Sequence, residues 1–113
     1  MRHLQCSLFV GYVNGRALMR ITGEVDGSNV ERLEETLRLI DDPLTVDCSR
    51  LDFLDGSALQ VLARDADLHG GMILRHPPPW LCRLVHIAEL DGHFVLDPSA
   101  VEGDEFPPTM LTG

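Results

Sequence analysis

The chain has 113 residues, which is enough for one ordinary domain and too few for two. Its 44% hydrophobic and 24% charged residues are typical of globular proteins and exclude a disordered or fibrous chain. The formal charge of −9 argues against duplex nucleic acid or an anionic membrane surface as a partner, because either would repel the chain.

A β-hairpin opens the predicted fold. Apolar runs over residues 7–12 and 17–22 indicate two short strands. Asn14-Gly15 lies between them, and an Asn-Gly pair flanked by apolar runs is a strong signal for a tight hairpin turn. The chain therefore begins with two antiparallel strands.

A helix and a strand are expected next. Ser28 and Glu31 match a capping box, with a hydroxyl at the N-cap and a carboxylate three residues later. Asp41-Asp42-Pro43 ends the helix, and residues 44–48 form a short, mostly apolar strand. The helix has an apolar stripe at a spacing of 3.6 residues: Val30, Leu33, Leu37 and Ile40.

Two further helix–strand pairs complete the pattern. A loop containing Asp52 and Asp55 leads to a helix over residues 57–68, which His69-Gly70-Gly71 ends before a strand over 72–74. The prolines at 77–79 start a third helix, which runs from 79 to 90 and precedes a strand over 93–96. The expected buried stripes are Leu59, Leu62, Ala63 and Ala66 in the second helix and Leu81, Leu84, Val85 and Ala88 in the third.

The predicted order is β-β-α-β-α-β-α-β, which places the chain in the α/β class. Strands separated by helices pair in parallel through right-handed crossovers, and the initial hairpin makes the small sheet mixed. Helices pack against this sheet in one domain over residues 5–96. Residues 97–113 are acidic, contain proline and have little periodic apolar content, so they are expected to form a flexible tail.

The cysteines and the apolar runs indicate a cytoplasmic protein. Cys6, Cys48 and Cys82 are odd in number and far apart, which is typical of a reducing compartment. They are expected to be buried packing thiols, with a response to oxidation as the alternative. No stretch approaches the roughly 18–20 apolar residues of a membrane span, and the N-terminus lacks the apolar region of a secretory signal.

Catalytic and metal-binding sites have weak support in the sequence. Asp47, Asp52 and Asp55 follow a strand and are candidates for Mg²⁺ binding or for phosphoryl acceptance by an aspartate, but turn formation and helix capping are favoured. All nine basic residues are arginines, and the absence of lysine excludes Schiff-base chemistry, a P-loop and a phospho-receiver site. The five histidines lack metal-ligand spacing, so no metal or cofactor is expected.

Three landmarks, taken in order, resemble the STAS domain, and in particular the anti-sigma factor antagonists of bacteria. The resemblance covers roughly residues 5–96. The landmarks are Gly23-Glu24-Val25-Asp26 before the first helix; Thr45-Val46-Asp47-Cys48-Ser49 followed by Asp52-Phe53-Leu54-Asp55-Gly56-Ser57-Ala58-Leu59; and the third helix followed by Asp91-Gly92-His93-Phe94.

This resemblance implies a non-catalytic switch. Such antagonists bind an anti-sigma factor of the serine-kinase type and free a sigma factor; phosphorylation by the kinase ends the binding, and a serine phosphatase reverses it. The family pattern Asp-Ser-(Ser or Thr)-Gly-Leu corresponds to residues 55–59, which differ from it at Gly56 and Ala58. The resemblance therefore assigns phosphorylation to Ser57. It implies a partner-binding surface of Gly23, Glu24, Asp26, Asp55, Gly56, Ser57, Ala58 and Leu59.

The residues around Ser57 suit such a switch without reference to any family. Asp55 is a good N-cap, which leaves Ser57 in the first turn of the second helix, at the surface. A phosphoryl group there meets free amides and the positive end of the helix dipole, and adds about −1.5 to −2 charges beside Asp55.

Two alternatives remain open at this point. The first is a STAS-type interaction module that is never phosphorylated and serves as a scaffold or subunit in a regulatory or transport complex; the departures at Gly56 and Ala58 favour it. The second is a small enzyme that uses the aspartates at 47, 52 and 55.

Overall fold

The computed structural model describes residues 5–98, in which six strands form one sheet beside three helices. Most of the expected tail, residues 99–113, lies outside the described residues. The strands are β1 (Cys6–Val13), β2 (Arg16–Val25), β3 (Leu44–Asp47), β4 (Leu51–Leu54), β5 (Met72–Arg75) and β6 (Phe94–Asp97). The helices are α1 (Val30–Arg38), α2 (Gly56–Leu68) and α3 (Pro79–Ile87), and a short 3₁₀ turn, η1 (Asp91–His93), precedes β6.

The sheet is mixed, as the sequence predicts. Its strand order is β1-β2-β3-β5-β6; β1 pairs antiparallel with β2, and all other pairs are parallel. Asn14 and Gly15 both have positive φ angles, 53° and 79°, as the tight turn between β1 and β2 requires.

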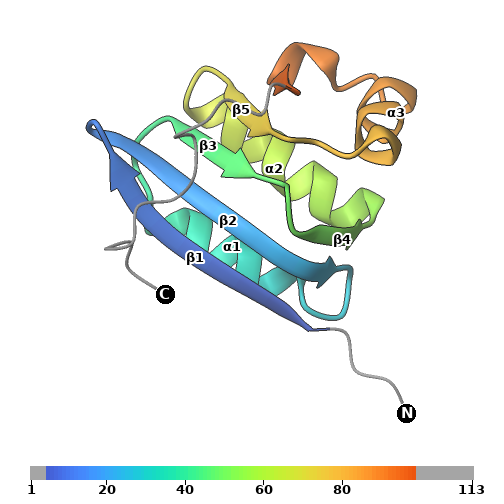
Figure 1. The fold of residues 1–113 in the computed structure, drawn as a ribbon, viewed down its shortest axis with the longest axis horizontal. Helices are drawn as coiled ribbons and strands as arrows, with labels where there is room; N and C mark the ends of the chain where they lie inside the picture. The colour runs from blue at the N-terminus through green and yellow to red at the C-terminus, as the bar shows by residue number, and fades with distance from the viewer. Residues whose placement is uncertain (1–4, 99–113) are drawn as a thin grey trace.

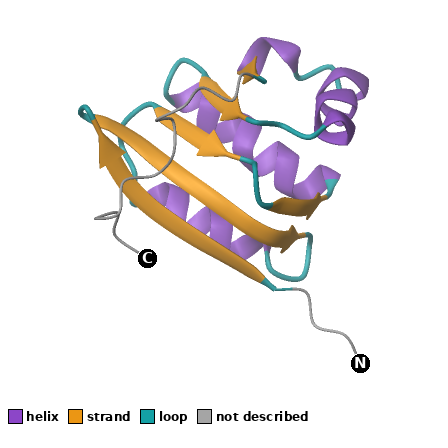
Figure 2. Cartoon of the chain, in the orientation of Figure 1, coloured by secondary structure: helices purple, strands orange, loops and turns teal. Residues whose placement is uncertain are grey.

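The three helices pack on one face of the sheet (Figures 1 and 2). Each crossover connection moves one step in the same direction, from β2 through β3 and β5 to β6, so right-handed crossovers place α1, α2 and α3 on the same side. Leu33 of α1, Leu62 of α2 and Leu81 of α3 join Met19 and Val46 of the sheet in a single core. Close packing of these buried side chains fixes where each helix begins relative to the strands.

The segment before α2 is a strand, and the prediction of a simple loop there is wrong. Residues 51–54 form β4, which pairs in parallel with the carboxyl half of β2. The ten-residue β2 is long enough to pair with β3 along its first half and with β4 along its second half. Leu51 and Leu54 are buried, so the pairing adds two apolar side chains to the core.

The prediction of a capping box before α1 is also wrong. The N-cap is Asn29, whose side chain makes no cap hydrogen bond, and the Ser28 hydroxyl donates instead to Asp26 Oδ1 at 2.6 Å. The Asp26 carboxylate is two residues away and also accepts the Ser28 amide at 2.7 Å, so it competes successfully for the hydroxyl.

The third helix is shorter than predicted. It ends at Ile87, and Glu89 adopts a left-handed conformation with φ of 58°. This reversal turns Leu90 back into the core and leaves Ala88 exposed, although the predicted stripe contained Ala88. The buried residues of the stripe are Leu81 and Val85.

Candidate functional site

The junction between β4 and α2 is organised by Asp55. Asp55 is the N-cap of α2, and its Oδ1 accepts the Ala58 amide at 3.0 Å. Its own amide donates to the Val25 carbonyl at 3.1 Å, which ties the start of α2 to the end of β2. The cap predicted from the sequence is therefore present, and it is held against the sheet.

Ser57 lies on the surface at this junction. Its side chain is exposed, and its hydroxyl donates to Asp55 Oδ1 at 2.6 Å. Ser57 is in the first turn of α2, where amides point outward and the helix dipole favours negative charge. The oxygen is therefore accessible to a modifying enzyme, and a phosphoryl group fits there electrostatically.

The loop between β2 and α1 also donates a hydrogen bond to the Asp55 carboxylate. Gly27 donates its amide to Asp55 Oδ2 at 3.2 Å, and a Cβ on Gly27 would lie 4.0 Å from Ser57 Oγ. Within the loop, Asn29 accepts the Asp26 amide at 2.9 Å and donates to the Glu24 carbonyl at 2.9 Å. The two helix N-termini thus form one continuous surface with Asp55 between them.

Hydrogen bonding sets the ionisation of this carboxylate. Partial burial on its own raises the pKa of Asp55, but hydrogen bonds from the Ser57 hydroxyl and from the amides of Ala58 and Gly27 outweigh it. The pKa of Asp55 is consequently lowered from its ordinary value. Asp55 is therefore a carboxylate at neutral pH, and a neighbouring phosphate would repel it.

The predicted partner-binding residues divide into a surface group and a buried group. Gly56 and Ser57 are exposed, while Gly23, Glu24, Asp26 and Asp55 are half-buried around the same loop. Ala58 and Leu59 have 0% and 1% of their surface exposed and pack into the core, so their side chains do not face a partner. Ala58 and Leu59 instead anchor the first turn of α2 in the hydrophobic core.

Phe53 is a surface residue that the sequence analysis did not single out. It lies on β4 opposite Glu24, two residues before Asp55, and 46% of its surface is exposed. Aromatic residues, phenylalanine included, are enriched at protein–protein interfaces relative to the rest of the surface. No pattern within residues 51–54 would have found it, because β4 forms only through its pairing with β2, and exposed Asp52 and Phe53 lie between buried Leu51 and Leu54.

Two of the three aspartates considered as an enzymatic cluster, Asp47 and Asp55, have separate structural partners. Asp47 is buried and accepts from Arg20 Nε at 3.1 Å and from the Ser49 amide at 3.0 Å. Burial raises its pKa, but these hydrogen bonds outweigh burial and lower the pKa overall. Asp52 is exposed on β4. Among residues 5–98, no three His, Cys, Asp or Glu side chains lie close enough together to hold a metal ion.

The cysteines are free thiols. Cys6 and Cys48 are buried and Cys82 is half-buried. Burial raises the pKa of Cys48 to about 12, with smaller contributions from Asp47 and Cys82, so the thiol stays protonated and unreactive.

No helix in the described part of the chain is long and apolar enough to cross a membrane.

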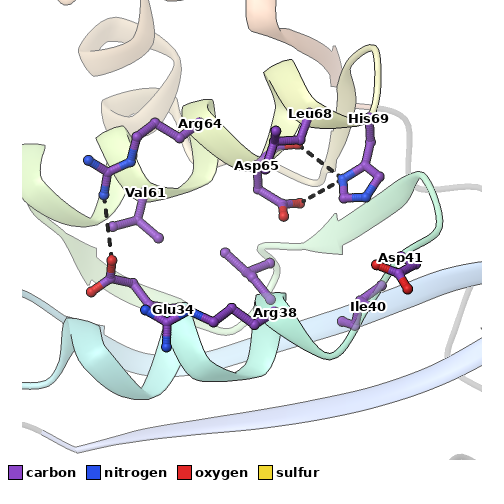
Figure 3. A pocket seen from close by; sticks show the side chains of 10 residues that line it. Glu34, Arg38, Ile40, Asp41, Val61, Arg64, Asp65, Leu68 and His69 are labelled. Carbon is purple, nitrogen blue, oxygen red and sulfur yellow. Dashed lines mark hydrogen bonds and ion pairs between the residues drawn. The ribbon is translucent and has the colours of Figure 1, made fainter.

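A groove of about 610 Å³ lies between α1 and α2, away from Ser57 (Figure 3). An ion pair between Arg64 and Glu34 crosses it at 3.6 Å. Asp65 in its wall is only 8% exposed, and burial raises the pKa of this carboxyl although His69, 3.7 Å away, opposes the shift. Neither Asp55 nor Ser57 lines this groove, so it is separate from the junction.

Replacing the cap should destabilise the domain. We expect Asp55→Ala to lower the free energy of unfolding by about 1 kcal/mol at pH 7, because it leaves the Ala58 and Gly27 amides without their acceptor. The lowered pKa means that this stabilisation is present above the unfolded-state pKa, about 4, and is lost as the pH falls through the folded-state value. Urea unfolding from pH 7 to pH 3 should therefore show the two proteins converge.

Asp52→Ala is the matched control for that measurement. Asp52 is an exposed carboxylate three residues away, so its removal should change stability by less than about 0.5 kcal/mol. An Asp55→Ala variant as stable as Asp52→Ala at pH 7 would contradict the role given to the cap.

Comparison with known proteins identifies the family of the domain that contains the β4–α2 junction. A family model described as "Mlab, STAS domain" matches residues 13–98. The chain belongs to the STAS domain family. Membership of this family agrees with the expectation that the chain is not an enzyme, since a 27% identical relative is an anti-sigma factor antagonist. A search of the curated proteins finds no match.

Solved STAS structures agree with this assignment. An anti-sigma factor antagonist from Mycobacterium paratuberculosis is 27% identical, with a TM-score of 0.73, over 85% of this chain and 88% of that one. The anti-sigma factor antagonist SpoIIAA in its unphosphorylated form is 20% identical with a TM-score of 0.66, over 87% and 91% of the two chains. Phosphorylated SpoIIAA of Bacillus is 17% identical with a TM-score of 0.61, over 90% and 95%. At 20% and 17% identity, the two SpoIIAA structures support only the assignment of the fold.

Proposed function

We propose that this STAS domain is an anti-sigma factor antagonist controlled by phosphorylation of Ser57. It binds an anti-sigma factor of the serine-kinase type in the cytoplasm and thereby frees a sigma factor for transcription. The kinase phosphorylates Ser57 and ends the binding, and a serine phosphatase restores it. No cofactor is needed, because the kinase supplies the ATP site.

The observation that carries this proposal is the exposed Ser57 hydroxyl at the N-terminus of α2. It donates to Asp55 at 2.6 Å, beside the loop that begins α1, so a phosphoryl group on this oxygen would alter the charge of one continuous surface. The 27% identical anti-sigma factor antagonist supports this role. The contact surface is Glu24, Asp26, Asp55, Gly56 and Ser57, with Gly23 shaping the backbone and Phe53 added as the apolar contact.

Phosphorylation can be tested with purified proteins. The chain, Ser57→Ala and Ser28→Ala are each incubated with ATP and the serine-kinase-type anti-sigma factors of the source organism, and intact masses are measured. Ser28 is a matched control, because its exposed hydroxyl also donates to an aspartate at 2.6 Å but lies before α1 begins. The unaltered chain and Ser28→Ala should gain one phosphoryl group, and Ser57→Ala none. Undiminished labelling of Ser57→Ala would rule out the site.

The alternative is a STAS module that binds its partner without phosphorylation, in a regulatory or transport complex. Gly56 and Ala58, which replace the first hydroxyl and the glycine of the antagonist pattern, favour it, and the family model carries the description "Mlab". The intact mass of the protein isolated from its host separates the two, since a fraction heavier by one phosphate supports the switch.

A further inference from the structure

The sequence Asp-Gly-Ser occurs twice on the surface around Asp55. Residues 26–28 precede α1, and residues 55–57 begin α2. In both copies the serine is exposed, and its hydroxyl donates to Oδ1 of the aspartate two residues before it at 2.6 Å. A kinase that recognised only the sequence Asp-Gly-Ser would therefore find two similar hydroxyl groups, those of Ser28 and Ser57.

The carboxylate of the second copy is held by backbone from two parts of the chain. Asp55 Oδ1 accepts the Ala58 amide at 3.0 Å, and Oδ2 accepts the Gly27 amide at 3.2 Å. The Asp55 amide donates in turn to the Val25 carbonyl at the end of β2. Because both oxygens are bonded to backbone amides, the carboxylate cannot rotate freely, and it offers the Ser57 hydroxyl a fixed acceptor.

The carboxylate of the first copy has no such support among residues 5–98. Asp26 Oδ1 accepts the amide of Ser28 at 2.7 Å and its hydroxyl at 2.6 Å, so both donors belong to the serine itself. Ser28 also lies before Asn29, the N-cap of α1, and is outside the helix. The Asp26 and Ser28 side chains can therefore change rotamer together, whereas Ser57 is held against the fold.

We infer that Asp55 is a positioning residue for the phosphorylation of Ser57, and that its backbone-held carboxylate makes Ser57 the acceptor in preference to Ser28. Phosphoryl transfer depends mainly on placing the attacking oxygen in line with the leaving group, so a hydroxyl fixed in one orientation reacts faster. Ser57 Oγ forms a bond to the γ-phosphorus of ATP while that phosphorus loses its bond to ADP, and the hydroxyl proton passes through Asp55 Oδ1 to water. The inference rests on the proposed function and names the residue that selects its site.

Asp55→Asn tests this role without removing the cap, because asparagine is as good an N-cap as aspartate. Its side-chain amide cannot accept from both Ala58 and Gly27, so the acceptor of the Ser57 hydroxyl is weaker and less fixed. The rate of phosphorylation is measured with ATP and the serine-kinase-type anti-sigma factors of the source organism, over a range of chain concentrations. We expect kcat to fall about 100-fold for Asp55→Asn. Asp52→Asn, an exposed carboxylate on β4, is the matched control and should keep kcat unchanged.

Three outcomes would overturn the inference. Equal kcat values for Asp55→Asn and Asp52→Asn, or a change confined to KM, would show that Asp55 does not position the hydroxyl, although labelling of Ser57 in the unaltered chain would still support the switch. Labelling of Ser28 in the unaltered chain, located by peptide mass, would show that the carboxylate does not select the acceptor. If the unaltered chain gains no phosphate from any of these kinases, the proposed function and the inference fail together.

A measurement on the unaltered chain does not depend on any variant folding. The Hα–Hβ couplings of Ser57 in a nuclear magnetic resonance spectrum should be those of a single rotamer, and those of Ser28 should be averaged over several rotamers. Averaged couplings at Ser57, or a single rotamer at both serines, would contradict the inference.

Discussion

Phosphorylation of Ser57 should weaken binding to the anti-sigma factor by about 100- to 1,000-fold, which corresponds to about 2.7–4 kcal/mol. The hydroxyl now donates its proton to Asp55 at 2.6 Å. A phosphoryl group removes that donor and places about −1.5 to −2 charges against a carboxylate that is ionised at neutral pH. A partner surface that fits the neutral hydroxyl would then meet a dianion and lose affinity.

The same modification should leave the domain folded. Ser57 is exposed, and the outward amides in the first turn of α2 stabilise negative charge. Calorimetry should therefore give the large change in dissociation constant while circular dichroism and the unfolding midpoint change little. Ser57→Ala should retain most of the affinity, because it adds no charge. Equal affinities for the phosphorylated and unphosphorylated chain would end the switch hypothesis, although the domain would remain a binding module.

Gly23→Ala is the substitution we expect to damage the fold most among the predicted site residues. Gly23 has φ of +96°, and a Cβ there would lie 2.3 Å from the Gln5 carbonyl oxygen. That oxygen is backbone and accepts the Glu24 amide at 2.9 Å, so it is not free to move aside. We expect a loss of about 3 kcal/mol in the free energy of unfolding, from backbone strain and the steric clash together.

Gly15→Ala is the matched control for this effect. Gly15 also has a positive φ, +79°, but a Cβ there meets nothing within 4 Å. The free energy of unfolding of Gly15→Ala should fall by only about 1 kcal/mol, because alanine is strained in the left-handed conformation but meets no steric clash. Urea unfolding of both variants measures the difference, and equal losses would show that the close approach to Gln5 has no cost.

The role of Gly23 explains why a glycine begins the first landmark. The register of β2 against β4 shifts between Gly23 and Glu24, and on the other side of β2 the β1 residue Cys6 pairs with Gly23. Only a residue without a side chain fits between these strands. Gly23 therefore acts on the surface around Asp26 through the backbone and does not itself present a side chain to a partner.

Local patterns in the sequence determined the elements whose signals lie within a few residues. The Asn14-Gly15 turn, the stripe of α2 and the cap at Asp55 depend on backbone preferences and hydrogen bonds between near neighbours. The predicted order of strands and helices, which lacked only β4, followed from them. The initial hairpin made the sheet mixed, and strands separated by helices paired in parallel through right-handed crossovers. The position of Ser57 in a first helical turn follows from the same cap.

Contacts between segments far apart in the chain decided the features that the sequence did not reveal. β4 forms because β2 offers a free edge, which no pattern within residues 51–54 reveals. Asp47 turns toward Arg20 on another strand, and Ala58 and Leu59 are buried because the sheet lies beneath α2. The approach of Gly27 to Asp55 joins residues 28 positions apart. Such contacts depend on how the helices and strands pack in three dimensions, and packing brings together residues whose separation in the chain carries no periodic signal.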